Sequence, residues 1–180
     1  VQGGKLNVYD GELRPMDAAG SVKPEFSATS YQEMMSERAV QNSYAKEVYL
    51  NIDGGEQMYR VGPMARINVA DAMETPLAQK GFESFKENFP SPCHNTVLQM
   101  YAKLIELVYA CEKAHEIINN PALRGETRVP ANFKGGRGIA HIEAPRGTLI
   151  HDYQIDERGI VQAANMIIAT QQNTSAINNS

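Results

Sequence analysis

The chain has 180 residues, of which 42% are hydrophobic and 21% are charged, with no tryptophan and a formal net charge of −4. A chain of this length and composition can bury a core of its own. The negative charge and the lack of a long basic run argue against nucleic-acid binding, and no apolar stretch approaches the roughly 18 residues of a membrane span. The first residues also lack the basic and apolar regions of a signal peptide. We therefore expect one soluble, cytoplasmic domain covering residues 1–180.

The first half of the chain is predicted to contain two hairpins and two helices. An alternating run precedes the turn signal Asp10-Gly11, and Ser30 with Glu33 has the spacing of a capping box. Apolar residues at helical spacing follow Pro76 and end at Pro90. In chain order, we expect a hairpin around residues 5–11, a helix over 31–40, a hairpin of strands 44–52 and 58–61 around Asp53-Gly54-Gly55, and a helix over 76–89.

The second half is predicted to contain a long central helix and a small sheet. Apolar residues recur at alternating gaps of four and three over residues 92–119, and Asn119-Asn120-Pro121 ends this pattern because the residue before proline avoids the helical region. A loop over 131–138 then leads to a strand over 139–153, which pairs with a strand over 160–170. The fold class is therefore α+β, with a long central helix, β-hairpins and a small antiparallel sheet. The helix is expected to pack through the stripe Val97, Tyr101, Leu104, Val108, Cys111 and Ile118.

Arg146 is the most unusual residue of the predicted sheet, because it lies between Pro145 and Gly147. Proline fixes φ and removes a donor, while glycine lets the backbone pass close to another segment. The guanidinium is thereby held with little freedom, and such a charge needs an anionic partner. The structural alternative to a functional role is a buried ion pair with Glu143 or Asp152.

Four further stretches occur in this order: SYAKE at residues 43–47, YRVGPMARIN at 59–68, EAPRGTLIHDY at 143–153 and the turn Ile168-Ala169-Thr170. Together and in this order, they resemble the large subunit of [NiFe] hydrogenases. The resemblance is closest to the cytoplasmic, cofactor-reducing group. The family's nickel-binding motifs, RxCGxC and DPCxxC, are absent. Together with a start without Met and an end in a polar stretch, their absence favours a central-to-late fragment of a longer subunit.

The resemblance implies roles for the residues around Arg146. The guanidinium would sit over the open face of a nickel–iron pair, because arginine donates hydrogen bonds and cannot ligate a metal. The backbone at Ala144 and Pro145 would line one iron-bound cyanide. Glu143 would be an outer carboxylate that orients the loop or Arg146, since donors at metal sites need outer partners to hold their geometry.

The turn at Ile168-Ala169-Thr170 is implied to complete the same pocket. The Thr170 hydroxyl would donate to a second cyanide, while Ile168 and Ala169 would form the apolar wall around a carbonyl ligand. The family commonly has Pro-Ser where this chain has Ala169-Thr170, so the hydroxyl is retained and the backbone is less constrained. His151 is a candidate for an outer role such as proton relay, with a hydrogen-bonded structural histidine as the alternative.

No residue of the chain is expected to ligate metal. Cys93 and Cys111 lack CxxC spacing and are expected to be reduced and structural. A Ni–Fe(CN)2CO centre is implied only for the full-length parent, and the isolated chain is expected to be inactive.

The implied function is that of part of a catalytic large subunit, which oxidises H2 reversibly and reduces a soluble electron carrier. The implied partners are the remainder of the large subunit, an iron–sulfur small subunit and a cofactor-reducing, diaphorase-type module. The rival hypothesis is a metal-free scaffold domain of the same descent, like the quinone-module subunits of Complex I. Flanking CxxC motifs in the parent gene would distinguish the two.

Overall fold

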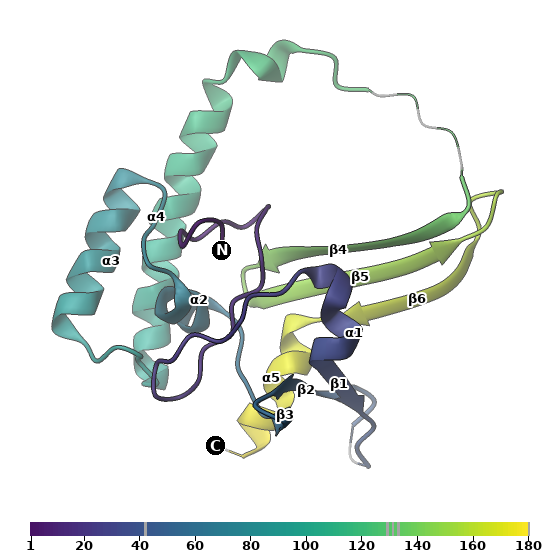
Figure 1. The fold of residues 1–180 in the computed structure, drawn as a ribbon. Coiled ribbons are helices and arrows are strands. Elements are labelled where there is room, and N and C mark those ends of the chain that lie inside the picture. The colour runs from purple at the N-terminus through teal and green to yellow at the C-terminus, as the bar shows by residue number, and fades with distance from the viewer. Residues whose placement is uncertain (42, 129, 131, 133, 180) are drawn as a thin grey trace.

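A computed structural model describes residues 1–41, 43–128, 130, 132 and 134–179. Figure 1 shows a helical region built from α2 (Pro63–Val69), α3 (Pro76–Asn88) and α4 (Gln99–Ile118), beside a region of two small antiparallel sheets. This arrangement matches the predicted fold class in its mixture of helices and antiparallel strands. Among the described residues, no helix combines the length and the apolarity needed to cross a bilayer.

Helix α3 confirms its prediction to within one residue at the C-terminal end. Its first N–H groups have no partner within the helix, and the Glu112 carboxylate of α4 accepts hydrogen bonds from Leu77 N at 3.0 Å and from Ala78 N at 3.0 Å. The favourable interaction of a carboxylate with a helix N-terminus thus ties α3 to α4.

Helix α4 begins at Gln99, after the 3₁₀ turn Thr96–Leu98, so the predicted start near residue 92 was wrong. The physical reason lies in α2. The Asn68 amide donates to Cys93 O and accepts from Cys93 N, both at 2.9 Å, which holds the backbone at Cys93 outside the helix. A further 3₁₀ turn, Pro121–Arg124, follows the end of α4.

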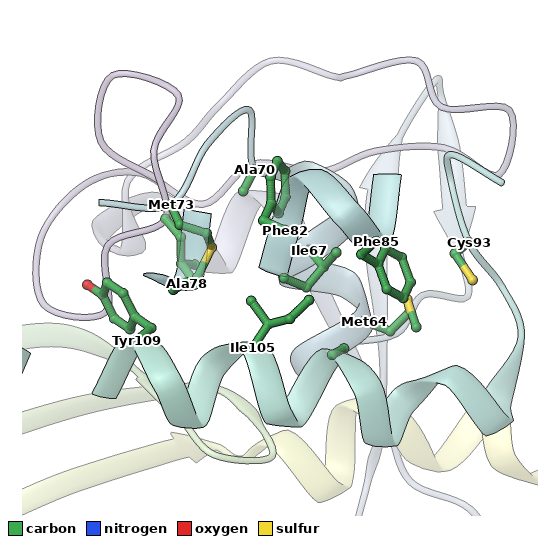
Figure 2. Packing of buried hydrophobic residues seen from close by; sticks show 12 residues of the cluster. Met64, Ile67, Ala70, Met73, Ala78, Phe82, Phe85, Cys93, Ile105 and Tyr109 are labelled. Carbon is green, nitrogen blue, oxygen red and sulfur yellow. The ribbon is translucent and has the colours of Figure 1, made fainter. Parts of the chain in front are cut away.

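The predicted packing face of α4 was largely wrong, although Tyr101 of that stripe does pack, with its ring centroid 5.4 Å from that of Phe85. The helix buries Ala102, Ile105 and Tyr109 against α2 and α3, as Figure 2 shows for Ile105 and Tyr109. Within the predicted stripe, Val97, Leu104 and Ile118 are exposed by 80%, 57% and 73%. Both sides of this helix carry apolar residues, so periodicity did not distinguish the face that packs. The helical core comprises Leu6, Met64, Ile67, Ala70, Met73, Ala78, Phe82, Phe85, Cys93, Ala102, Ile105 and Tyr109.

The predicted hairpin at residues 5–11 is absent from the described N-terminal segment. Leu6 instead enters the helical core, and its backbone N–H donates to Ala72 O at 3.0 Å. The Asn7 side chain accepts from the N–H groups of Tyr9 and Asp10, which turns the chain without strand pairing. The backbone hydrogen bond from Leu6 to Ala72 therefore takes the place of the expected local hairpin.

The predicted helix over residues 31–40 is also largely wrong. A 3₁₀ turn, Ala28–Ser30, is capped by Ser27 and leads into the single turn of α1 (Tyr31–Met34), and Ser30 forms no side-chain cap. The chain then becomes β1 (Met35–Arg38), because these residues pair with β2 (Glu47–Ile52). Sheet pairing thus overrode the local helical signal.

The second predicted hairpin is present, with shorter strands. β2 turns at Asp53 and Gly54, which have φ of 52° and 79°, and returns as β3 (Gly55–Gln57) rather than over residues 58–61. The left-handed pair at the turn fits the two-residue hairpin geometry that aspartate and glycine favour.

The second sheet has the order β4, β5 and β6, comprising Gly136–Ala144, Gly147–Ile155 and Val161–Ile167. The predicted single strand over 139–153 was wrong, because the chain reverses at Pro145 and Arg146 to pair β4 with β5. The β5–β6 pairing confirms its prediction, and β6 ends at Ile167 rather than at 170. The predicted loop over 131–138 gives way to β4 at Gly136, and residues 131 and 133 lie outside the described residues.

Helix α5 (Ala169–Asn178) was not predicted. It packs against β2 and β5, and so joins the two sheets (Figure 1). Around it lies a second core of Phe26, Tyr31, Met35, Val48, Leu50, Ile150 and Ile167.

Candidate functional site

The β4–β5 turn carries Arg146 and packs directly on the segment that precedes α2. Gly147 has a φ of 135°, and a Cβ placed on it would stand 3.0 Å from Gly62 N. In the reverse direction, a Cβ on Gly62 would stand 3.0 Å from Arg146 O. The close backbone approach expected from glycine beside Arg146 is therefore confirmed.

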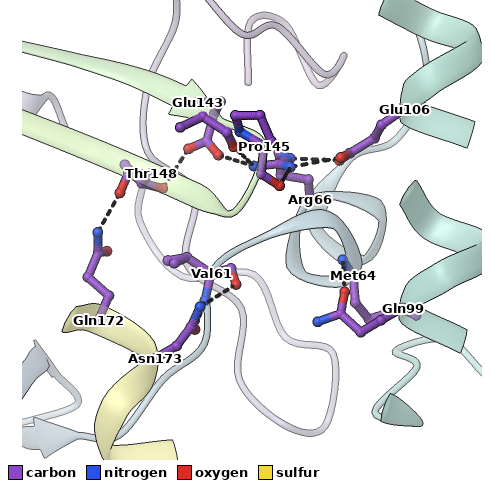
Figure 3. Close-up of polar contacts among 11 residues, drawn as sticks. Val61, Met64, Arg66, Gln99, Glu106, Glu143, Pro145, Thr148, Gln172 and Asn173 are labelled. Carbon is purple, nitrogen blue, oxygen red and sulfur yellow. Dashed lines mark hydrogen bonds and ion pairs between the residues drawn. The ribbon is translucent and has the colours of Figure 1, made fainter. Parts of the chain in front are cut away.

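Helix α5 begins at the same end of the sheet as this turn. Ile167, the last residue of β6, pairs with Ile150 near the start of β5. Gln172 Nε2 then donates to Thr148 O at 2.6 Å, so the first turns of α5 lie against the beginning of β5 (Figure 3).

Asn173 joins α5 to the segment before α2. Its side chain donates to Val61 O at 3.1 Å and accepts from Val61 N at 2.9 Å (Figure 3). Residues 59–62, 143–148 and 168–173 therefore meet at one place, although more than 100 residues separate the first from the last. Three of the four stretches that carry the family resemblance contribute to this junction, which we call the turn junction.

Arg146 itself is exposed at the turn junction. Within the described part of the chain, its side chain has no hydrogen bond or ion pair, so the alternative of a buried ion pair was wrong. The two carboxylates of that alternative hold other arginines. Glu143 Oε2 accepts from Arg66 Nη1 at 2.7 Å, and Asp152 Oδ1 accepts from Arg137 Nε at 2.8 Å.

The other predicted pocket residues lie at the same junction with different exposure. Pro145 and Thr170 are exposed, Ile168 is 45% exposed and Ala144 is half-buried, whereas Ala169 is buried. The carbonyl of Thr170 accepts the Thr174 hydroxyl at 2.9 Å, as in an ordinary helix turn, while none of the described residues bonds the Thr170 hydroxyl. Arg146 and Thr170 therefore present donors at the surface.

His141 and His151 lie within the paired parts of β4 and β5, several residues from the turn that carries Arg146. His151 on β5 stands opposite Ala140 and Met166, and its ring centroid is 5.5 Å from that of Tyr153. His141 lines a cavity of about 540 Å³ together with Glu143, as expected for two residues on one strand face. Among the described residues that line this cavity, Glu143 is the one that belongs to the predicted site.

Arg66 lies next to the turn junction and was missed by the sequence analysis. Its guanidinium lies buried beneath the turn, where it bonds both carboxylate oxygens of Glu106 at 2.6 and 2.7 Å. Glu143, which also accepts the Thr148 hydroxyl at 2.5 Å, takes a third donor of Arg66 (Figure 3). Arg66 lies within the YRVGPMARIN stretch, so the signal was present, but no spacing rule connected it with residues 40 and 77 positions away.

Electrostatics hold the Arg66 guanidinium in its charged form. Burial lowers the pKa of this group, but the hydrogen bonds and charges of Glu106 and Glu143 outweigh burial and raise the pKa above its ordinary value. A buried charge persists only with such partners. Arg66 is therefore a buried, ion-paired cation next to the turn, whereas Arg146 is exposed and forms no ion pair with the residues that the structure describes.

The donor set at the turn junction fits hydrogen bonding to an anionic ligand rather than metal coordination. In the described ranges, no three His, Cys, Asp or Glu residues converge to hold a metal ion. Cys93 is buried, Cys111 is exposed, and both are free thiols. The arginine and hydroxyl donors, together with the positive end of the α5 dipole, favour an anion supplied from outside this chain.

Comparison with known proteins identifies relatives of the whole chain. One of them belongs to the F420-non-reducing hydrogenase vhu of Methanococcus voltae and is 42% identical over 175 residues, which cover 96% of this chain and 42% of the relative. The beta subunit of the NAD-reducing hydrogenase HoxS of Cupriavidus necator is 38% identical, covering 96% of this chain and 36% of the relative. These relatives are hydrogenase subunits.

The fold agrees with these relatives. A crystal structure of an NAD⁺-reducing [NiFe]-hydrogenase superposes with a TM-score of 0.86 at 29% identity, over 97% of this chain and 40% of that one. No protein-family model matches the chain. The resemblance inferred from the motifs is confirmed at the level of hydrogenase subunits, and the chain spans about two fifths of the length of the relatives it matches.

Proposed function

We propose that this chain forms part of the catalytic large subunit of a cytoplasmic [NiFe] hydrogenase, which oxidises H2 reversibly and passes the electrons to a soluble carrier. The turn junction is the observation that carries the proposal. It brings the Arg146 turn and the Ile168-Ala169-Thr170 turn to one end of a sheet, as one shared pocket requires. The hydrogenase relatives and the matching fold support the same assignment.

The residues of this chain would bind and orient the ligands of the metal centre. When bound, a nickel–iron centre with cyanide and carbonyl ligands supplies the redox chemistry on hydrogen. Arg146 donates hydrogen bonds and keeps its proton, so it favours anionic ligands without competing for metal. Thr170 adds a hydroxyl donor near the positive end of α5. The backbone at Ala144 and Pro145 would line one cyanide ligand.

The apolar residues of this pocket would exclude water. Ile168 presents an exposed side chain beside Thr170, whereas Ala169 packs inward. Covering Ile168 with the rest of the large subunit would strengthen the nearby hydrogen bonds, because a dry site has a low effective dielectric constant. His151 would keep an outer role, since its ring contacts Tyr153 on the sheet.

The partners follow from the same proposal. The remainder of the large subunit would supply the thiolates that hold the metals, since the described residues lack a convergent ligand set. An iron–sulfur small subunit would receive the electrons. The NAD-reducing relative supports a diaphorase-type module as a further partner.

The rival hypothesis, a metal-free scaffold of Complex I type, assigns no function to the two exposed donors Arg146 and Thr170. The parent coding sequence distinguishes the hypotheses. The hydrogenase proposal expects a CxxC motif on each side of residues 1–180, and their absence would favour the scaffold.

Replacing Arg146 in the complete hydrogenase tests the proposed role. Arg146→Lys should leave the nickel and iron content nearly intact and lower the rate of H2 oxidation by at least about tenfold, because a point-like ammonium cannot reproduce the planar donor fork. Arg158→Lys is the matched control, since Arg158 is an exposed arginine in the β5–β6 turn. Near-normal turnover of a fully metallated Arg146→Lys enzyme would overturn the proposal.

A further inference from the structure

The guanidinium of Arg66 has an acceptor for every one of its donors. The side chain is 8% exposed and carries five N–H groups. Three of them bond carboxylate oxygens, two on Glu106 and one on Glu143. The remaining two reach backbone carbonyls, Ala144 O at 3.0 Å and Pro145 O at 3.3 Å. A group bonded at all five positions has one orientation available to it.

The two carbonyl acceptors belong to Ala144 and Pro145, the residues immediately before Arg146. The Pro145 carbonyl belongs to the peptide group that joins Pro145 to Arg146, so a bond to this oxygen fixes the plane from which the Arg146 side chain departs. The Ala144 carbonyl fixes the peptide before it. Arg66 thus orients both peptide groups on the N-terminal side of Arg146.

Arg66 also connects this turn to the helical core. Its own backbone lies in α2, and the bidentate pair with Glu106 anchors its head group to α4. Ile67, the next residue, is fully buried in the helical core. The turn is consequently held by a rigid element outside the sheet, as precise positioning of a functional group requires.

We propose that Arg66 is a positioning residue for Arg146, which sets the direction of the Arg146 guanidinium through the Ala144 and Pro145 carbonyls. This inference rests on the proposed function in so far as Arg146 acts on the ligands of the metal centre. Lysine cannot replace Arg66, because an ammonium has three donors and no planar fork. The variant Arg66→Lys keeps the charge and loses the peptide orientation.

Hydrogen exchange tests the positioning without any metal. In Arg66→Lys, the peptide covering residues 143–150 should exchange about tenfold faster than in the unaltered protein, as expected for the loss of a charge-assisted hydrogen bond. Arg14→Lys is the matched control, because Arg14 is also largely buried and bonds two carboxylates and a backbone carbonyl away from the turn. Equal exchange of this peptide in the two variants would overturn the inference, whatever the outcome for Arg146.

A double-variant cycle in the complete hydrogenase tests the action through Arg146. Arg66→Lys alone should lower H2 oxidation and shift the infrared bands of the diatomic ligands while the metal content is retained. In the Arg146→Lys background, the same change should have little further effect on turnover, since the residue it positions is already altered. Fully multiplicative losses would show that Arg66 acts independently. Unaltered turnover in Arg146→Lys would overturn the proposed function and leave the exchange result to decide the structural role of Arg66.

Discussion

Gly147 is the residue of the β4–β5 turn at which the fold excludes a side chain. Its φ of 135° lies in a region that favours glycine, and a Cβ there would stand 2.8 Å from Val61 Cβ, with Val61 Cγ2 closer still. A sparsely populated backbone conformation costs about 1–3 kcal/mol and overpacking roughly another 1–3 kcal/mol. We expect Gly147→Ala to lower the free energy of unfolding by about 2–6 kcal/mol in total.

Two other glycines separate the two contributions. Gly54 has a φ of 79° and no atom within 4 Å of a built Cβ, so Gly54→Ala should show the conformational cost alone, about 1–2 kcal/mol. Gly138 in β4 has neither a positive φ nor a neighbour within 4 Å. Gly138→Ala should therefore change stability by less than about 1 kcal/mol.

Urea denaturation of the protein and the three variants, followed by circular dichroism, measures these differences. The slope of the transition should stay constant, so that midpoints report stability alone. We expect the largest loss of stability for Gly147→Ala and the smallest for Gly138→Ala. A loss at Gly147 no greater than that at Gly54 would refute the close packing of the turn on residues 61–62.

Two further predictions concern titration and thiol access. Hydrogen bonds from Arg137 and then from Tyr31 hold the pKa of Asp152 below its ordinary value of 3.8, so the carboxylate stabilises the fold above this pH and loses that effect as the pH falls through the lower folded value. Asp152→Asn should thus lower the free energy of unfolding near neutral pH. In urea denaturation, the difference in this free energy between the variant and the unaltered protein should shrink below pH 3.8. A difference that stays constant with pH would contradict this role of Asp152. Under native conditions an alkylating reagent should modify the exposed Cys111 and spare the buried Cys93, and intact mass should show two modified thiols after denaturation without reductant; one or no modified thiol would contradict the free-thiol state.

The sequence by itself determined the features that depend on local signals. Proline marked both ends of α3, and aspartate with glycine marked the β2–β3 turn, because these residues restrict or extend φ wherever they occur. The motif stretches also indicated the hydrogenase relationship and the residues that gather at the turn junction. Their common location was implied by resemblance, and the pairing of β5 with β6 agrees with it.

Tertiary structure decided the features in which two local outcomes were close in energy. Residues 35–38 became a strand because β2 was available to pair with them, and α4 packed through Ala102, Ile105 and Tyr109 although its opposite side is also apolar. Arg146 is exposed rather than ion-paired, because Glu143 pairs with Arg66 and Asp152, which lies further along β5 from the turn, pairs with Arg137. Spacing along the chain carries no information about such competition, since a buried charge selects its partner by proximity in the folded state, across 40 or 77 residues in the case of Arg66.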